Sequence, residues 1–445
     1  MDKVIKFLEK YFVPVAGKIA GQKHLQSVRD GLILSTPLVI FGSLFLVIAF
    51  LPIPGYSDFM AATFGDQWLG KLLYPLNASF NLLGMFVSIG VAYRLAEKYK
   101  VDALSAAAIS LGSYMMLIPF QVMFTPEGTS EAVAVGGAIP SALVGSRGMF
   151  VAIIIAILTT EIFRKIVQKG IVIKMPAGVP PAVAKSFAAL IPACACVGTV
   201  WIIRLVFEAT SYETLFNFIN TVLAVPLTKA GTGLVGTIVA ILAIHLLWAF
   251  GLHGATIVDS VMLPVWTQLT DQNRLAFQAD PNGILPNIVT RQFLDVFILI
   301  GGSGATLVLC ILMLRFAKSK QLRQLGRLSI GSGLFNINEP IIFGMPIVMN
   351  PIMMIPFILG PVVVTIISYL ALKTGIVARL AGIAMPWTSP IFVSGFLASG
   401  GKISVVALQA VNFLIMAAIY YPFFRVWDKK KCEEEEKEDK LSKAS

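Results

Sequence analysis

The stretch IMMIPFILGPVVVTIISYLALK, residues 352–373, holds no charged residue before its final lysine. A helix needs about 20 apolar residues to cross the ~30 Å hydrocarbon core of a bilayer. Runs of similar length and composition occur at 32–51, 234–250 and 297–314. Hydrophobic residues make up 57% of the 445-residue chain and charged residues 13%, which excludes an ordinary soluble domain. The sequence predicts a membrane protein with several crossings.

The net charge of +11 comes from basic residues in short loops beside apolar runs, not from one basic domain. This distribution follows the positive-inside rule and argues against nucleic-acid binding. Residues 1–23 alternate lysine with apolar residues at helical spacing, which predicts an amphipathic helix on the membrane surface rather than a cleaved signal. Residues 52–69 and 125–148 carry few basic residues and are expected outside the cell.

The basic anchors and the apolar runs together predict an all-α membrane protein with about ten transmembrane helices and both termini in the cytoplasm. One crossing is expected in the broken segment between Trp248 and Arg291. The others are expected near residues 30–51, 70–94, 103–124, 148–164, 186–208, 233–250, 293–314, 351–372 and 403–424.

Three apolar segments contain too many glycines and prolines for simple helices, and we expect them to be re-entrant: 251–266, 331–350 and 382–400. Irregular backbone at membrane depth is tolerated only where protein or a water-filled cavity satisfies its polar groups. Transporters build substrate sites from such discontinuous segments. The charged tail 429–445 is expected to be disordered.

Glu339 lies in the apolar stretch FNINEPIIFG, where an ionisable side chain is a functional candidate. The amides of Asn336 and Asn338 precede it, and Pro340 biases it away from helical dihedrals. A desolvated carboxylate there would suit proton abstraction from a hydroxyl. The alternative is a carboxylate that caps a loop or pairs with an arginine.

A second polar group is His253 in WAFGLHGATIVDS, flanked by Gly251 and Gly254, with Trp248 upstream. His253 either contacts a ligand or is a buried histidine whose ring nitrogens are hydrogen-bonded within the protein. Sugars expose flat C–H faces as well as hydroxyls, so Trp248 and Trp387 beside Glu and His residues fit a sugar site. The alternative is that these tryptophans anchor helices at a membrane interface. We expect His245, in mid-span, to be structural.

Arg94 ends an apolar span, where it either snorkels to the cytoplasmic face or helps hold a phosphoryl group there. The four cysteines and three histidines show no metal-ligand spacing, so we expect no metal site and no cofactor.

The run FNINEPIIFGMPIVMNP at 335–351, with WAFGLHG at 248–254, MPAGVPPAVAKSFAALIP at 175–192 and FILIGGSGATL at 297–307, resembles enzyme IIC of the sugar phosphotransferase system. It is most similar to the lactose, cellobiose and diacetylchitobiose family. The similarity covers nearly the whole chain.

The resemblance implies a permease of the bacterial cytoplasmic membrane that moves a disaccharide by an elevator-like motion. A phosphocysteine on a separate enzyme IIB phosphorylates the sugar at a 6-hydroxyl. By this resemblance Glu339 hydrogen-bonds the hydroxyl to be phosphorylated and acts as its base, and His253 also contacts the sugar. The other pocket positions are Trp248, Gly254, Asn338 and Trp387. The resemblance also implies a homodimer with an N-terminal dimerisation half, residues 1–208, and a C-terminal sugar-binding half, residues 209–428.

The chain has no enzyme IIB phosphocysteine loop, and Cys432 in KKKCEEEEKE is unsuited to carry phosphate because negative charge opposes a thiolate. Two other functions stay open at this point. One is a proton- or sodium-coupled sugar symporter in which Glu339 and His253 carry the coupling proton. The other is a membrane sensor or scaffold whose polar groups only join helices.

Overall fold

The computed structural model describes residues 13–444 except 52, 127–130, 177, 346 and 349. The amphipathic helix predicted over residues 1–23 falls largely outside this part, and α2 (Val13–Ala20) is its described segment. The described chain is helical apart from loops and one antiparallel hairpin of β1 (Gln121–Phe124) and β2 (Val133–Gly136). The predicted all-α class is therefore confirmed.

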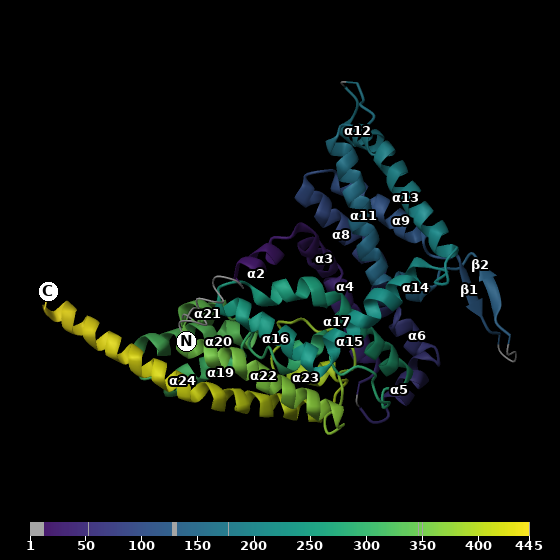
Figure 1. Cartoon of the computed structure of the whole chain (residues 1–445). Helices are drawn as coiled ribbons and strands as arrows, with labels where there is room; N and C mark the ends of the chain where they lie inside the picture. The colour runs from purple at the N-terminus through teal and green to yellow at the C-terminus, as the bar shows by residue number, and fades with distance from the viewer. Residues whose placement is uncertain are drawn as a thin grey trace.

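The first half of the chain forms the helices drawn in purple to teal in Figure 1. They are α3 (Lys23–Ile33), α4 (Thr36–Ala49), α5 (Tyr56–Phe64), α6 (Trp68–Leu72), α7 (Tyr74–Phe80), α8 (Leu83–Tyr99), α9 (Ala103–Met116), α10 (Ser141–Val144), the 3-10 turn η2 (Ser146–Gly148), α11 (Met149–Gln168), α12 (Pro181–Ala188), α13 (Leu190–Glu208), α14 (Leu215–Ile219), the π-helical η3 (Asn220–Ala224) and α15 (Val225–Thr232).

The second half, teal to yellow, lies beside and below the first in Figure 1. Its helices are α16 (Leu234–Ala249), α17 (Gly254–Ala279), α18 (Arg291–Phe297), α19 (Leu307–Phe316), α20 (Lys320–Leu334), α21 (Glu339–Gly344), α22 (Pro351–Lys373), α23 (Val393–Ala398) and α24 (Ile403–Ala444).

Four helical stretches of the described chain are long and apolar enough to cross a membrane: Lys23–Ala49, Pro181–Glu208, Pro351–Lys373 and Ile403–Lys440. The number rises to six if the bent pairs α7 with α8 and α14–α15 with α16 each count as one span. Helices also lie in the other predicted crossings, but α9 and α19 are shorter than a full span. The end of the crossing predicted at 103–124 is not helical, because residues 121–124 form strand β1.

Two expectations about helix continuity are wrong. The predicted crossing at 293–314 is not one helix, because α18 ends at Phe297 and α19 begins at Leu307. Gly301, Gly302 and Gly304 in the intervening loop all have positive φ, which a right-handed helix excludes. Conversely, the segment 251–266 is not irregular beyond its first three residues, because α17 begins at Gly254 and runs unbroken through Pro264.

The other two predicted irregular segments are confirmed as breaks in helical structure. Residues 335–338 separate α20 from the six-residue α21, and residues 375–392 form an extended connection before α23. In physical terms, the Asn-Glu-Pro sequence and the Gly- and Pro-rich sequence at 382–390 both disfavour continuous helix.

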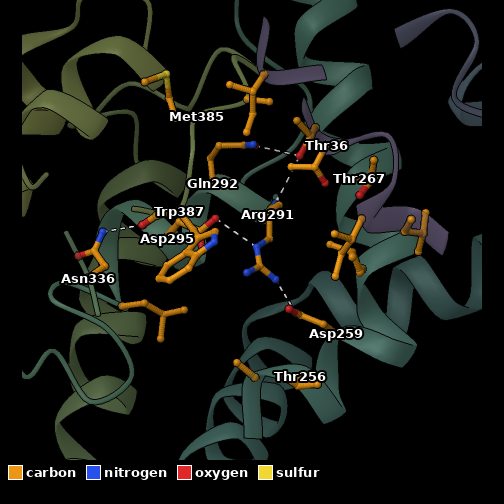
Figure 2. A pocket seen from close by; sticks show the side chains of 18 of the residues that line it. Thr36, Thr256, Asp259, Thr267, Arg291, Gln292, Asp295, Asn336, Met385 and Trp387 are labelled. Atoms are coloured by element: carbon orange, nitrogen blue, oxygen red, sulfur yellow. Dashed lines mark hydrogen bonds and ion pairs between the residues drawn. The ribbon is translucent and has the colours of Figure 1, made fainter. Parts of the chain in front are cut away.

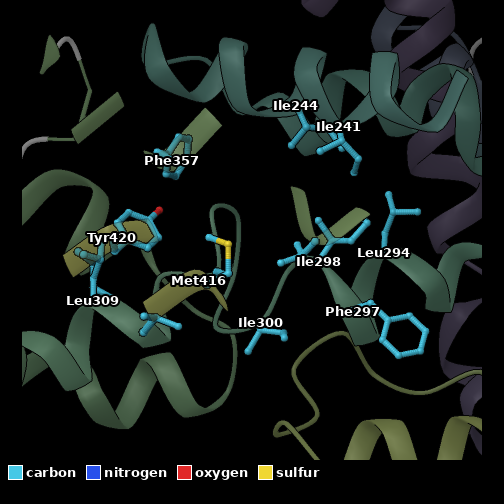
Figure 3. Close-up of a cluster of buried hydrophobic side chains, with 14 of the residues drawn as sticks. Ile241, Ile244, Leu294, Phe297, Ile298, Ile300, Leu309, Phe357, Met416 and Tyr420 are labelled. Atoms are coloured by element: carbon cyan, nitrogen blue, oxygen red, sulfur yellow. The ribbon is translucent and has the colours of Figure 1, made fainter. Parts of the chain in front are cut away.

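Two large hydrophobic cores divide the part of the chain that the structure describes. One is formed by side chains from Val28 to Ala224 with part of α17 and residues 381–384, and the other by side chains from Ala240 to Trp427. Figure 3 shows part of the second core, where Ile241, Phe357 and Tyr420 come from three different helices. The boundary predicted at 208/209 stays a prediction, although Leu215 and Phe216 pack with the first core.

Helix α17 belongs to both cores. Trp266 packs in the second core, whereas Val265 and Leu269 pack in the first. On the side of the first core, the buried guanidinium of Arg274 donates to Asp271 at 2.6 Å and lies 4.6 Å from the centroid of the Phe80 ring. The contact with Phe80, together with a hydrogen bond from the Ser146 hydroxyl to Asp271, fastens α17 to the N-terminal half.

The tail is also not as expected, because α24 continues as a helix to Ala444 and projects from the body in Figure 1. Lys431 pairs with Glu434 at 2.7 Å, one of the i,i+3 and i,i+4 pairs that favour a helix in this charged run. The charged part of α24 also contacts the start of α20. Asp428 accepts from the backbone N–H groups of Lys318 and Ser319 at 3.0 Å, and Glu435 accepts from those of Lys320 and Gln321.

These carboxylates satisfy the free N–H groups at the start of α20, as a capping side chain does within one helix. Replacing Asp428 with alanine is therefore expected to lower the free energy of unfolding by about 1–2 kcal/mol. It should also speed amide exchange at residues 318–319, measured by hydrogen–deuterium exchange mass spectrometry. Glu436→Ala, at an exposed position of the same helix, is the control. Unchanged exchange in Asp428→Ala would contradict the capping role.

Candidate functional site

A cavity of about 430 Å³ lies between the two cores. One wall comes from α3, α4 and neighbouring residues of the first half, including Leu32, Thr36 and Phe80. The other wall comes from α17, α18, the glycine loop at 298–306, the α20–α21 connection and residues 384–387. Irregular backbone from three separate parts of the second half therefore meets at one place.

Asn336 joins these irregular segments. Its Oδ1 accepts from the backbone N–H of Gly301 at 2.7 Å. Its Nδ2 donates to the backbone carbonyls of Trp387 and Ser389 at 2.6 and 3.0 Å. Its φ of 63° is a left-handed conformation that asparagine adopts more readily than most residues. One side chain thus fixes the glycine loop and the Trp387 segment to the connection that leads to Glu339.

Asn338 adds a second connection, because its Nδ2 donates to the carbonyl of Ser303 at 2.8 Å. Gly302 has φ of 93°, and a Cβ there would collide with the Asn338 amide. The glycine loop therefore needs Gly302 both for its dihedrals and for the close approach of Asn338.

His245 is structural, as expected. It is fully buried, its Nδ1 lies 2.7 Å from the Ile241 carbonyl, and its Nε2 accepts from the N–H of Gly304 at 2.9 Å. Because a backbone N–H can only donate, Nε2 carries no hydrogen and Nδ1–H donates to Ile241. The Tyr420 hydroxyl donates to the Gly304 carbonyl at 2.7 Å, so both polar groups of this glycine are satisfied.

His253 lies in the cavity wall at the N-terminus of α17 and caps that helix. Its Nδ1 accepts from the N–H of Thr256 at 3.3 Å and lies 2.6 Å from the Thr256 hydroxyl. The hydrogen of a neutral ring is therefore on Nε2, which remains a donor. Its ring centroid lies 4.4 Å from that of Trp248, whose buried indole N–H has no hydrogen-bond partner in the described part of the chain.

Glu339 begins α21 and lines the cavity. The expectation of a dry, desolvated carboxylate is wrong, because the residue is exposed, at the surface of a wide cavity. The alternative of a carboxylate locked to an arginine is not seen either, since Glu339 makes no ion pair or hydrogen bond with any residue that the structure describes. Its oxygens are free to accept from a ligand.

Trp387 also lines the cavity and is 54% exposed, so its indole face is available to a ligand (Figure 2). The structure thus brings together five of the predicted site residues: Glu339, His253, Trp248, Asn338 and Trp387.

Two predicted site residues do not line the cavity. Gly254 is buried where a Cβ would collide with the carbonyl of Ile244, so it permits α17 to approach α16. Arg94, on α8, is exposed and pairs with Glu97 at 2.9 Å. Its suggested role at a phosphoryl group stays a prediction.

Sequence reasoning missed an ion cluster in the same wall. Arg291 of α18 pairs with Asp295 at 3.1 Å and with Asp259 of α17, and all three line the cavity (Figure 2). A signal was present in α17, where the cavity-lining residues recur at helical spacing: Thr256, Asp259, Leu263, Thr267 and Thr270. Spacings of three and four place such residues on one helix face.

No group of three or more His, Cys, Asp or Glu side chains suited to a metal ion occurs among the residues described. Cys432 lies in the charged part of α24, beyond its apolar run. Burial raises the pKa of its thiol, and the carboxylates of Asp428, Glu435 and Glu436 raise it further. This environment disfavours a nucleophilic thiolate.

Residues 29–361 match the family model of the phosphotransferase system EIIC. The chain belongs to this EIIC family. As an EIIC it is a sugar-specific permease component of a phosphotransferase system, which decides against the symporter and the scaffold. The resemblance inferred from the Asn-Glu-Pro and Gly-Leu-His-Gly motifs is confirmed.

This EIIC is 58% identical over 442 residues to the PTS system cellobiose-specific EIIC component of Geobacillus stearothermophilus, covering 99% of this chain and 98% of the relative. It is similar to the crystal structure of the transporter ChbC, the IIC component from the N,N'-diacetylchitobiose-specific phosphotransferase system. The TM-score is 0.94 and the identity 55%, over 97% of this chain and 99% of that one.

A more distant relative is the PTS system lactose-specific EIICB component of Streptococcus mutans, 30% identical over 98% of this chain. The match covers 74% of that protein, whose name joins a C and a B component.

The role of Asn336 as a connector is tested by Asn336→Asp. Aspartate also tolerates positive φ, so the change isolates the hydrogen bonds. A carboxylate cannot donate to the Trp387 and Ser389 carbonyls. We therefore expect the free energy of unfolding to fall by about 1–3 kcal/mol. Thermal unfolding measures the loss, and hydrogen exchange at 386–392 should accelerate. The exposed Asn282→Asp is the control, and equal melting temperatures for the two variants would contradict the role.

Proposed function

We propose that this EIIC carries a disaccharide of the cellobiose or diacetylchitobiose type and presents it for phosphorylation at a 6-hydroxyl. The observation that carries the proposal is the convergence of Glu339, His253 and Asn338 with the indoles of Trp248 and Trp387 on one cavity. The indole rings offer apolar faces to the C–H faces of pyranose rings. The two relatives described above, a cellobiose-specific EIIC component and an N,N'-diacetylchitobiose-specific IIC component, are named for the same class of sugar.

The chemistry assigned to the cavity is phosphoryl transfer from a phosphocysteine of a separate enzyme IIB. The 6-hydroxyl oxygen attacks phosphorus, the new O–P bond forms, and the S–P bond breaks with departure of the thiolate. Glu339 accepts the hydroxyl proton, since its oxygens have no other partner in the described structure. His253 donates from Nε2 to a sugar oxygen and orients the hydroxyl. Such transfer depends mainly on positioning and charge control.

The partner must supply the thiol, because Cys432 is held in a negatively charged environment. The name of one relative joins a C and a B component, which supports an enzyme IIB as the partner. We place both termini on the cytoplasmic side of the bacterial plasma membrane, following the positive charge near Arg315–Arg327 and at the start of the tail.

Movement of the sugar is assigned to an elevator-like displacement of the second core against the first. The cavity at their boundary, with one wall from each, supports this assignment. The fixed part would be a homodimer formed by the N-terminal half. Exposed apolar residues such as Trp201, Ile202 and Val206 on α13 offer this half an apolar face for a second copy or for lipid.

Glu339→Gln is the central test. In vesicles supplied with phosphorylated enzyme IIB, we expect sugar phosphate formation to fall by at least about 100-fold, because the proton acceptor is lost. Equilibrium binding of cellobiose to the purified variant should change much less. Glu131→Gln, the same substitution at an exposed glutamate outside the cavity, is expected to retain phosphorylation within twofold and serves as control. Full activity of Glu339→Gln would refute the assigned role.

A further inference from the structure

The cavity holds more negative than positive charge. Glu339, Asp259 and Asp295 line it, and each contributes one negative charge when ionised. Among the lining residues that the structure describes, Arg291 is the only lysine or arginine, and it is already paired with both aspartates (Figure 2). One positive charge against three negative charges leaves a net charge of −2 when His253 is neutral.

The proposed reaction makes this imbalance worse. A phosphoryl group brings roughly −1.5 to −2 of additional charge at neutral pH. Repulsion between like charges is stronger in a protein interior than in water. Phosphoryl transfer is promoted mainly by positioning and by positive charge, and arginine suits phosphate oxygens because it can donate two parallel hydrogen bonds. We therefore looked for a cation near Glu339 that the cavity carboxylates do not neutralise.

Arg29 of α3 fits this requirement by its place in the fold. Helix α3 packs against α17. Leu32 and Ile33 of α3 line the cavity, and Arg29 precedes them by three and four residues, so it lies on the same helix face one turn nearer the start of α3. The charge of Arg29 acts on the His253 ring, as does that of Glu339. Arg29 thus lies beside the reacting end of the cavity, just beyond the residues that line it.

The surroundings of Arg29 leave it with charge and a donor to spare. Its Nε donates to Asp30 at 2.8 Å, and its Nη2 donates to the same oxygen. Lys98 of α8 pairs with the other oxygen of Asp30 at 2.9 Å. Two cations therefore share one carboxylate, which leaves a net charge of +1. Nη1 of Arg29 has no hydrogen-bond partner among the residues described.

We propose that Arg29 binds the phosphoryl group during its transfer from enzyme IIB to the sugar, and that Asp30 orients the guanidinium for this task. Nη1 donates to a phosphoryl oxygen, and the positive charge offsets the repulsion from the cavity carboxylates. Arg29 forms no covalent bond: the O–P bond still forms as the S–P bond breaks, and Glu339 still accepts the proton. The proposal rests on the proposed function, which supplies the phosphoryl group.

A purely structural role for Arg29 is one competing explanation. The contacts of Arg29 with Asp30 lie within α3, whereas the pair Lys98–Asp30 joins α3 to α8 and would survive the loss of Arg29. Any structural damage would affect all ligands of the cavity alike. A contact with the phosphoryl group affects only ligands that carry one. Comparing a sugar with its phosphate therefore separates the two explanations.

The experiment measures dissociation constants of cellobiose and cellobiose 6-phosphate for the purified full chain by titration calorimetry. In Arg29→Gln, we expect binding of cellobiose 6-phosphate to weaken by about tenfold or more and binding of cellobiose to stay within twofold. Retained cellobiose binding also shows that the variant folds. Arg29→Lys keeps the charge but not the paired donors, so we expect an intermediate loss. Equal weakening of both ligands would overturn the proposal.

The rate of sugar phosphate formation is the second measurement. With saturating cellobiose and phosphorylated enzyme IIB, we expect this rate to fall by about tenfold or more in Arg29→Gln. Arg147→Gln, at an exposed arginine outside the cavity, is the matched control and should change neither the rate nor the two dissociation constants. An unchanged rate in Arg29→Gln would refute the role.

Arg94→Gln is measured in parallel, because Arg94 is the arginine that the sequence suggested for this task. Its guanidinium is exposed and pairs with Glu97, so we expect no selective loss of cellobiose 6-phosphate binding. A selective loss in Arg94→Gln but not in Arg29→Gln would contradict the proposal. If the unsubstituted protein binds no disaccharide and forms no sugar phosphate, the proposed function itself fails, which is a different result from a fully active Arg29→Gln variant.

Discussion

The polar backbone of the loop between α18 and α19 must be satisfied inside an apolar protein, and the site depends on how this is achieved. At membrane depth an unpaired N–H or carbonyl is costly, so non-helical backbone needs partners from the protein itself. His245 and Tyr420 satisfy Gly304, while Asn336 satisfies Gly301. These partners come from α16, α24 and the α20–α21 connection, so the loop holds distant parts of the chain together.

The site geometry follows from this arrangement. Asn336 binds the carbonyls of Trp387 and Ser389, and Asn338 binds that of Ser303. Glu339 follows directly in the chain, so its position is set by backbone hydrogen bonds rather than by contacts of its own carboxylate. That leaves the carboxylate free for a ligand. The asparagines of the Asn-x-Asn-Glu-Pro sequence therefore have a structural task, which is to fix the backbone that places the glutamate at the cavity.

Helix α17 connects the two cores and carries both kinds of aspartate. Asp271 pairs with Arg274 against the first core, and Asp259 pairs with Arg291 in the cavity wall. The two pairs look alike in sequence. Only their surroundings distinguish a pair that fixes the helix from a pair that remains available to a ligand, because one is enclosed by Ser146 and Phe80 and the other lines the cavity.

The sequence by itself determined the membrane class, the helical fold, the family and five of the cavity residues. Apolar runs of span length, basic loops and the Asn-Glu-Pro and Gly-Leu-His-Gly motifs are local signals, and each is readable without knowing what lies opposite. Tertiary structure decided the rest. The exposure of Glu339, the break at 298–306 and the helical tail depend on partners more than 30 residues away, such as Asn336 for Gly301 and Lys318 for Asp428. Arg291 became a cavity residue for the same reason, since no local pattern shows that α18 packs beside α17 in the cavity wall.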